Sequence, residues 1–236
     1  MNVLRYLLIP SAAMALGACG VTKPPQTIDI RRELVSRRSE RGELSVLFIG
    51  NSYSFGVPKA FGKLAGSHGK RLHVDQVTHS GWTLARHVAD RGTLQKIQER
   101  HWDVVVLQEQ SRLPSLPVRR AWMMVPAVMK LAEKVRAQGG IPVLYQTWGR
   151  RDGDSNRPHD DFHAMNVRLR EGCRAAAEKA GGLPVVPAGD AWQREVLAGR
   201  GDRLFQPDGS HPTPQGDVLT AEVFYRTFFG GGPSLQ

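Results

Sequence analysis

The stretch that decides the fold runs from Leu44 to Ser54 and reads LSVLFIGNSYS. Residues 44–49 form a β-prone apolar run that stops at Gly50, Asn51 and Ser52. A continuous apolar run of this length is typical of a parallel strand that is buried on both faces. The segment therefore predicts a strand that ends in a glycine-containing turn carrying a serine.

Similar apolar runs recur along the chain and alternate with segments of helical periodicity. Further strands are expected at residues 72–77, 104–107, 141–146 and 183–186. Helical patterns cover residues 58–68, 84–100, 119–138 and 160–180, and a last helix is expected with Pro214 in its first turn. This alternation predicts one three-layer α/β/α domain around a central five-stranded parallel sheet. Loops after the carboxyl ends of the strands should then form the site.

The composition excludes several classes of protein. The chain has 236 residues, 41% of them hydrophobic, and only 2 cysteines, which excludes a disulfide scaffold and a structural zinc site. No long apolar run lies beyond the N-terminus, which excludes a polytopic membrane protein. The 32 Lys and Arg against 22 Asp and Glu give a net charge of +10. This excess fits anionic lipid headgroups, acidic polysaccharide or a solvated basic surface, and no aromatic-basic motif indicates a nucleic-acid partner.

The first 18 residues look like a targeting segment rather than part of the fold. Arg5 precedes an apolar stretch at residues 7–16, too short to span a bilayer, and Leu16-Gly17-Ala18-Cys19 follows. This ending resembles the lipobox of bacterial lipoproteins, which implies cleavage before Cys19 and a lipid-anchored protein of the bacterial cell envelope. Gly20 fits forwarding to an outer membrane and periplasm where these exist. The alternative is an ordinary signal peptide with a chance cysteine.

A tether is expected between the lipidation site and the folded domain. Residues 19–43 contain Pro24-Pro25 and a charged stretch at residues 31–43 with few apolar side chains. This composition is typical of a linker, whose end could form a short helix. The expected organisation is therefore a signal peptide at 1–18, a tether at 19–43 and a domain at 44–236.

Two loops carry the residue types of a serine hydrolase. Ser52 directly follows a buried strand, which presents its hydroxyl at the sheet edge and leaves its backbone N–H free to bind an anion. Asp208 stands three residues before His211, in a turn that Pro212 keeps out of a helix. Such a carboxylate can hold the imidazole tautomer while the other ring nitrogen accepts a serine proton. Each loop taken alone could be an ordinary turn.

Together these motifs resemble the SGNH/GDSL hydrolase superfamily over about residues 44–230. The family's first block, Gly-Asp-Ser-x-Ser, matches Gly50 to Ser54 with Asn51 in place of Asp. The last block, Asp-x-x-His, matches Asp208 to His211. The second block is a glycine after the second strand, where Gly81 stands.

The resemblance implies a flavodoxin-like fold and a role for each matching residue. Ser52 would be the nucleophile, His211 the general base and acid, and Asp208 the partner that orients His211. The backbone N–H groups of Ser52 and Gly81 would stabilise the oxyanion. No metal or organic cofactor is needed for this chemistry.

The block after the third strand departs from the family's usual Gly-x-Asn-Asp. This chain reads Leu107-Gln108-Glu109-Gln110-Ser111 there, which is similar to carbohydrate O-acetylesterase branches of the superfamily. A glutamine amide can replace the asparagine as third oxyanion donor. Gln108, nearer the strand end, is the first candidate and Gln110 the second. The alternative for either residue is a buried amide network that holds the loop.

Aromatic and basic residues in the same loops are candidates for substrate binding. Trp148 and Arg150 follow the fourth strand, and Trp82 follows the second. An aromatic ring beside an arginine suits a sugar face or an anionic group, whereas packing in the core or at the rim is the alternative for each tryptophan. Asp190 is expected to cap the next helix.

The resulting hypothesis is a membrane-tethered serine esterase that works through an acyl-enzyme. The expected substrate is a small-molecule or polysaccharide ester with a small acyl group, notably acetyl on carbohydrate. A lipid esterase, phospholipase or thioesterase of the same fold is one alternative. A non-catalytic lipoprotein that binds glycan or lipid is another, although a pure binder has no need for a complete set of Ser, Asp and His. The oligomeric state is not predicted.

Overall fold

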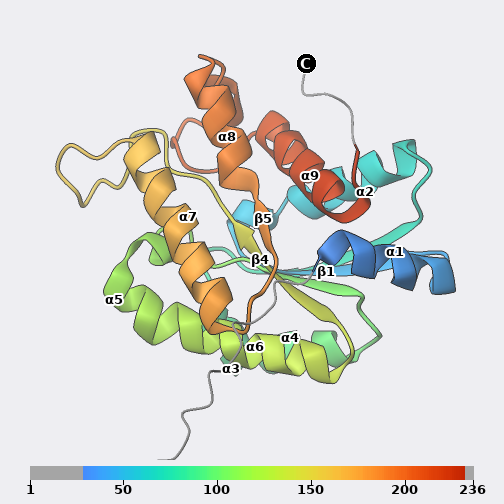
Figure 1. Cartoon of the computed structure of the whole chain (residues 1–236). Helices are drawn as coiled ribbons and strands as arrows, with labels where there is room; N and C mark the ends of the chain where they lie inside the picture. The colour runs from blue at the N-terminus through green and yellow to red at the C-terminus, as the bar shows by residue number, and fades with distance from the viewer. Residues whose placement is uncertain (1–28, 232–236) are drawn as a thin grey trace, which may run out of the picture.

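A computed structural model describes residues 29–231 of the chain. At its centre lies a five-stranded sheet in the order β2-β1-β3-β4-β5, in which every neighbouring pair is parallel (Figure 1). The strands are β1 (Leu44–Gly50), β2 (Leu72–Thr78), β3 (Val104–Leu107), β4 (Ile141–Gln146) and β5 (Val185–Pro187). The predicted three-layer α/β/α fold is confirmed.

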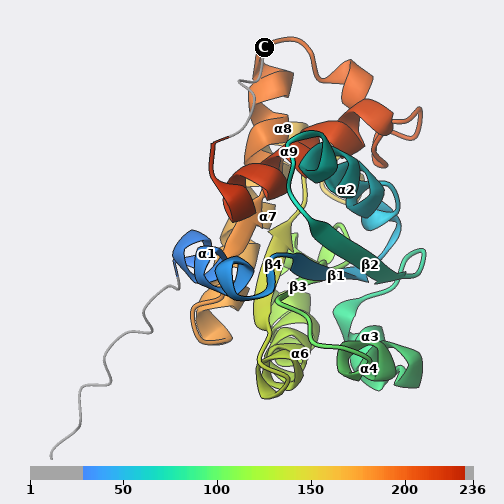
Figure 2. The same ribbon diagram turned by 90° about the vertical axis from the view of Figure 1, so that its right-hand side faces the viewer.

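Helices cover both faces of the sheet, which is why the central strands β1, β3 and β4 are buried throughout. Figure 2 shows α2 and α9 on one side of the sheet and α3, α4 and α6 on the other. The helices are α1 (Ile30–Arg41), α2 (Val57–Ser67), α3 (Leu84–Ala89), α4 (Arg91–Gln98), α5 (Pro117–Arg119), α6 (Val125–Ala137), α7 (Phe162–Lys179), α8 (Ala188–Leu197) and α9 (Pro214–Phe229). One apolar cluster joins the sheet to α1, α2, α8 and α9, and a second joins it to α3, α4, α6 and α7.

The helix predicted over residues 84–100 is in fact two helices, α3 and α4, which meet at Asp90. The Asp90 carboxylate accepts a hydrogen bond from the Thr93 N–H at 2.6 Å and so caps α4. An N-cap residue has an extended backbone, and ψ of Asp90 is 120°. The chain therefore cannot continue as one helix through this residue.

The helix predicted over residues 119–138 begins earlier and is not uniform. It starts with α5 at Pro117, passes through a π-helical turn at Arg120–Met124 and continues as α6. Pro126 lies in the first turn of α6. A proline there is tolerated because the first turn does not need its missing N–H.

Two details of the structure after β4 differ from the predictions. The fifth strand begins at Val185 rather than at residue 183, and α8 follows it with no intervening loop. Pro187 occupies the N-cap position, so the expected capping role of Asp190 is wrong. The Asp190 carboxylate instead accepts a hydrogen bond from Gln146 Nε2 at 3.0 Å, at the end of β4.

The helix α1 shows that the predicted tether extends too far along the chain. Ile30 and Leu34 are buried in the apolar cluster that also contains α9, and Arg37 donates a hydrogen bond to the Gly139 carbonyl at 2.7 Å. The packed structure therefore includes residues 30–41, which were expected to lie in the linker. Cys19 and the targeting segment lie outside the described residues. Within residues 29–231, no helix is both long and apolar enough to cross a membrane.

Candidate active site

The first site residue, Ser52, lies where β1 ends at the carboxyl edge of the sheet. It begins a short 3₁₀ turn, Ser52–Ser54, which the Asn51 side chain caps by accepting a hydrogen bond from the Tyr53 N–H at 3.2 Å. Ser52 Oγ lies 2.9 Å from Nε2 of His211. The nucleophile and the base that the sequence predicts are thus in direct hydrogen-bond contact, although 159 residues separate them.

Asp208 organises the loop that carries the histidine. One carboxylate oxygen accepts hydrogen bonds from the backbone N–H groups of Ser210 and His211 at 2.9 and 3.0 Å. The other lies 2.5 Å from Nδ1 of His211. Burial opposes ionisation of Asp208, but these hydrogen bonds outweigh it and lower the pKa of the carboxyl to about 2. Asp208 is therefore an anion at neutral pH and fixes both the ring and its tautomer.

A stack of aromatic rings packs against this loop and holds it by hydrogen bonds. Trp148 lies between Tyr53 and Trp192, with ring centroids 5.0 and 3.7 Å away. Its Nε1 donates to the carbonyl of Ser210 at 3.1 Å, and the Tyr53 hydroxyl lies 2.5 Å from Ser210 Oγ. Trp148 is completely buried. The expectation that it binds substrate is therefore wrong, because its ring packs in the core and its N–H holds the residue next to His211.

Two backbone N–H groups are available beside Ser52. Gly81 is exposed, with φ of +69°, and follows β2 in a loop that the Asn51 amide holds by donating to the Trp82 carbonyl at 2.9 Å. Within residues 29–231, neither the Ser52 N–H nor the Gly81 N–H donates to an acceptor. The loops after β1 and β2 therefore each retain an unused N–H donor, and their role as oxyanion donors stays a prediction.

Gln108, the first candidate for the third donor, is a structural residue instead. It is completely buried, and its Oε1 accepts hydrogen bonds from the Asn51 N–H at 2.8 Å and from Ser54 Oγ at 3.0 Å. Its Nε2 donates to Asn51 Oδ1 and to the carbonyl of Glu109. Both amide hydrogens are occupied, so Gln108 has none left for substrate. It belongs to the buried amide network that was the alternative for this position.

Gln110, the second candidate, has a free donor. Its Oε1 accepts hydrogen bonds from the N–H groups of Arg112 and Leu113 at 2.9 and 3.2 Å. Its Nε2 has no acceptor in the described part of the chain. The side chain is only half-buried. Of the two glutamines, Gln110 is the one whose amide could donate to an oxyanion.

The glutamate between them, Glu109, was not predicted to have a role. Its Oε1 accepts hydrogen bonds from the N–H groups of Leu84 and Gln110, at 3.1 and 2.7 Å, so it joins the start of α3 to the loop after β3. Its Oε2 is buried and has no partner in the described structure. Burial raises the pKa of the Glu109 carboxyl to about 7. Burial of this kind depends on the packed fold and leaves no pattern in the sequence.

The other two candidates for substrate binding lie at the same edge of the sheet. The half-buried ring of Trp82 contacts His79 at a centroid distance of 4.0 Å, and the Arg86 guanidinium lies 4.6 Å from it. Arg150 is half-buried and makes no ion pair with any described residue, and its Nε has no hydrogen-bond acceptor. The N–H of the next residue, Arg151, donates to the Gly209 carbonyl at 2.8 Å, so Arg150 adjoins the histidine loop.

Comparisons with solved structures agree with the fold that carries this site. No family model and no curated protein matches the chain. Among solved structures it is similar to a protein described as an SGNH hydrolase from Slackia heliotrinireducens, with 27% identity, a TM-score of 0.64, and coverage of 78% of this chain and 98% of that one. A DUF4886 family protein from Bacteroides uniformis has a TM-score of 0.70 at 18% identity, over 80% and 84% of the two chains. An acetyl-xylooligosaccharide esterase from Geobacillus has a TM-score of 0.59 at 18% identity, over 82% and 96%. The similarities at 18% identity concern the fold alone.

Proposed function

Because the chain belongs to the SGNH/GDSL hydrolase superfamily, we propose that it is a serine esterase with Ser52 as nucleophile, His211 as base and Asp208 as its orienting partner. One observation carries the proposal. Ser52 Oγ lies 2.9 Å from Nε2 of His211, while Nδ1 of the same ring lies 2.5 Å from the Asp208 carboxylate. This continuous series of contacts, from Ser52 through His211 to Asp208, is the geometry in which an imidazole removes a serine proton.

The reaction follows from these contacts. Ser52 Oγ attacks the ester carbonyl while His211 Nε2 accepts its proton, and the negative charge that develops on the carbonyl oxygen is stabilised by the N–H groups of Ser52 and Gly81 and by Gln110 Nε2. His211 then returns the proton to the alcohol, which leaves an acyl group on Ser52. Water then attacks the acyl-enzyme through the same steps, which releases the acid and regenerates the serine.

We infer that the preferred substrates carry small acyl groups, such as acetyl, on a carbohydrate. The Gln-Glu loop after β3 supports this inference, as does the unpaired Arg150 beside the histidine loop, which suits a polar or anionic alcohol better than a long acyl chain. One structural neighbour is described as an acetyl-xylooligosaccharide esterase. A lipid esterase or a thioesterase would use the same triad and is the second candidate.

Labelling with a fluorophosphonate probe tests the chemistry directly. We expect the wild-type chain to form a covalent adduct and Ser52→Ala to form none. Ser67→Ala is the matched control, because Ser67 is exposed on α2 and its hydroxyl contacts only local partners, the Leu64 carbonyl and Nδ1 of His68. Labelling that survives Ser52→Ala would overturn the assignment. A panel of esters from acetyl to long-chain, including acetylated sugars, then tests the substrate class.

A further inference from the structure

The segment that joins the loop after β3 to α6 presents an apolar row to solvent. Val118 is 71% exposed, Trp122 80% and Met129 48%. Pro126 is also exposed and continues the spacing of three or four residues that puts these side chains on one side of the helix. A tryptophan this exposed is unusual in a chain whose Trp102, Trp148 and Trp192 are all buried.

Basic side chains surround this apolar row. Residues 117–137 contain five Lys or Arg and one acidic residue, Glu133. Arg119, Lys130 and Lys134 form no ion pair or hydrogen bond with another described residue. Lys130 and Lys134 continue the row of Trp122 and Pro126 at intervals of four residues, so this row is apolar in its first half and cationic in its second.

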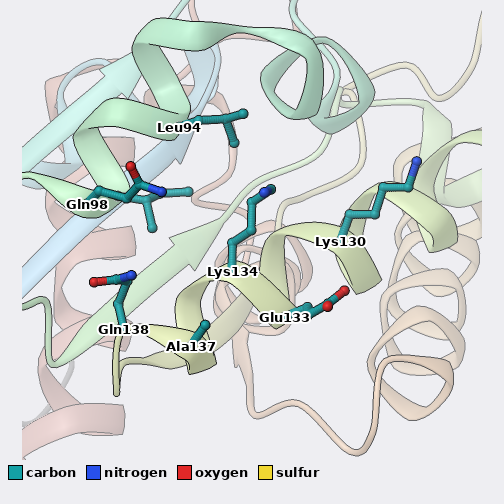
Figure 3. Close-up of a pocket in the computed structure, with 8 residues that line it drawn as sticks. Leu94, Gln98, Lys130, Glu133, Lys134, Ala137 and Gln138 are labelled. Atoms are coloured by element: carbon teal, nitrogen blue, oxygen red, sulfur yellow. The ribbon is translucent and has the colours of Figure 1, made fainter.

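The cationic half borders a hollow between α4 and α6. The hollow has a volume of about 410 Å³, and its lining includes Leu94 and Gln98 from α4 and Lys130 and Lys134 from α6. Figure 3 shows the two lysine side chains extending from the same side of α6. An apolar strip that includes a tryptophan and is bordered by unpaired lysines is the pattern of a surface that inserts shallowly between lipid headgroups.

We propose that this docking face, Val118, Trp122, Pro126 and Met129 with Arg119, Lys130 and Lys134, binds the surface of a bilayer that contains anionic lipid. The charge complementarity of three unpaired cations favours an anionic membrane over an apolar protein groove. The face begins directly after the loop of Gln110, because Leu113 N–H donates to Gln110 Oε1 and α5 starts at Pro117. Docking therefore brings the catalytic edge of the sheet close to the membrane. The proposal does not depend on the esterase assignment.

Vesicle binding of the full chain tests the docking face. The probes are vesicles of phosphatidylcholine alone and of phosphatidylcholine with phosphatidylglycerol, and every variant keeps residues 1–28, so differences between variants report the face. We expect Val118→Ser with Trp122→Ala to weaken binding to the anionic vesicles at least tenfold. We expect Lys130→Gln with Lys134→Gln to weaken it as well, and to leave binding to phosphatidylcholine unchanged. Leu197→Ala is the control, because Leu197 is similarly exposed but lies at the end of α8, on the far side of the molecule from α6 (Figure 1).

Tryptophan fluorescence separates this face from any other route to the membrane. Anionic vesicles should shift the emission to shorter wavelength, bromines in the acyl chains should quench it, and Trp122→Phe should remove both effects. Equal binding by all variants, or no quenching of Trp122 in bound protein, would overturn the proposal. It would also fall if Trp122→Ala converted a dimer to a monomer in the absence of lipid, since the face would then bind a second copy. Unchanged hydrolysis of a soluble ester and an unchanged melting temperature confirm that the variants are folded.

Discussion

The two glutamines after β3 differ in which of their hydrogen bonds are already made, and this gives opposite expectations for their removal. Gln108→Ala deletes the acceptor for the Asn51 N–H and for Ser54 Oγ. A buried group left without its partner costs about 1–3 kcal/mol, so we expect a lower melting temperature and activity that recovers on cooling. Thermal unfolding measured beside the kinetics checks this expectation.

Gln110→Ala should instead lower kcat while the melting temperature changes little. Its free Nε2 is the donor that would strengthen its bond when the carbonyl oxygen becomes charged, and loss of one such donor typically costs ~10²- to 10³-fold in rate. KM should stay nearly constant because the ground-state carbonyl is bound weakly. A Gln110→Ala enzyme with full kcat would exclude this residue from the oxyanion hole.

Glu109 should make stability depend on pH. The carboxyl has an ordinary pKa of 4.5 when unfolded and about 7 when buried. Between these values the unfolded chain loses a proton that the folded chain retains, so stability falls as pH rises through this window, by on the order of 3 kcal/mol. Glu109→Gln keeps the Oε1 acceptor and stays neutral. We expect it to match the wild type near pH 4 and to be more stable at pH 8.

Urea unfolding of both chains across pH 4–8 measures this difference. The comparison is needed because burial also raises the pKa of Asp217, to about 6, so part of the pH dependence is common to both chains. Equal slopes in the two chains would show that Glu109 is ionised in the folded protein at neutral pH.

Single residues show how far sequence reasoning reaches in this protein. Ser52, Asp208 and His211 could be predicted because each sits in a local pattern, a turn after an apolar strand or a carboxylate three residues before an imidazole. Gln108 could not be assigned correctly, because its partner Asn51 is 57 residues away. Both glutamines follow the same strand, and only the packed fold decides which amide already donates its hydrogen bonds within the protein.

At the scale of elements, the loop that carries His211 depends on the Trp148 ring, which the loop after β4 contributes. Trp148→Phe retains an aromatic ring between Tyr53 and Trp192 and removes the hydrogen bond from Nε1 to the Ser210 carbonyl. Small misplacements of a catalytic group are costly, so we expect kcat to fall by about tenfold or more with little change in KM.

Trp192→Phe is the matched control for this prediction. It also loses one indole hydrogen bond, from Nε1 to Thr220 Oγ1 at 3.0 Å, and it keeps the aromatic stack. That bond ends on α9 rather than on the histidine loop, so this variant should lose stability but not kcat. An equal loss of kcat in both variants would mean that the stack as a whole, rather than the Ser210 contact, positions His211.

Elements were predicted well where burial is continuous and poorly where local capping competes with periodicity. The central strands β1, β3 and β4 are mostly apolar and buried over their whole length, which fixes their existence and nearly fixes their bounds. The break at Asp90 depends on one side chain that prefers to cap α4. The helix α1 was hidden because its sequence is polar and, among residues 30–37, only Ile30 and Leu34 are buried in the core.

At the scale of the whole molecule, the packed α1 shortens any tether to the membrane. If Cys19 is the lipidated residue, ten residues at most separate it from Ile30, and these span no more than about 35 Å when fully extended. Arg37 of α1 contacts Gly139, just beyond the C-terminal end of α6, whereas the apolar part of the docking face lies at the start of the same helical segment. A helical segment of this length spans about 30 Å, which a fully extended tether can cover, so a lipid anchor and the docking face could act on one bilayer.

This arrangement predicts a two-stage release from membranes. Cys19→Ser should move most of the protein from the membrane fraction of cells to the soluble fraction, because two or more acyl chains hold a protein far more firmly than a surface helix does. The protein that remains should leave the membrane at high salt, since its attachment through Arg119, Lys130 and Lys134 is electrostatic and is screened. Adding Trp122→Ala to Cys19→Ser should remove it at low salt too. Membrane attachment of Cys19→Ser that resists high salt would instead mean that the apolar stretch at residues 7–16 remains uncleaved and holds the protein.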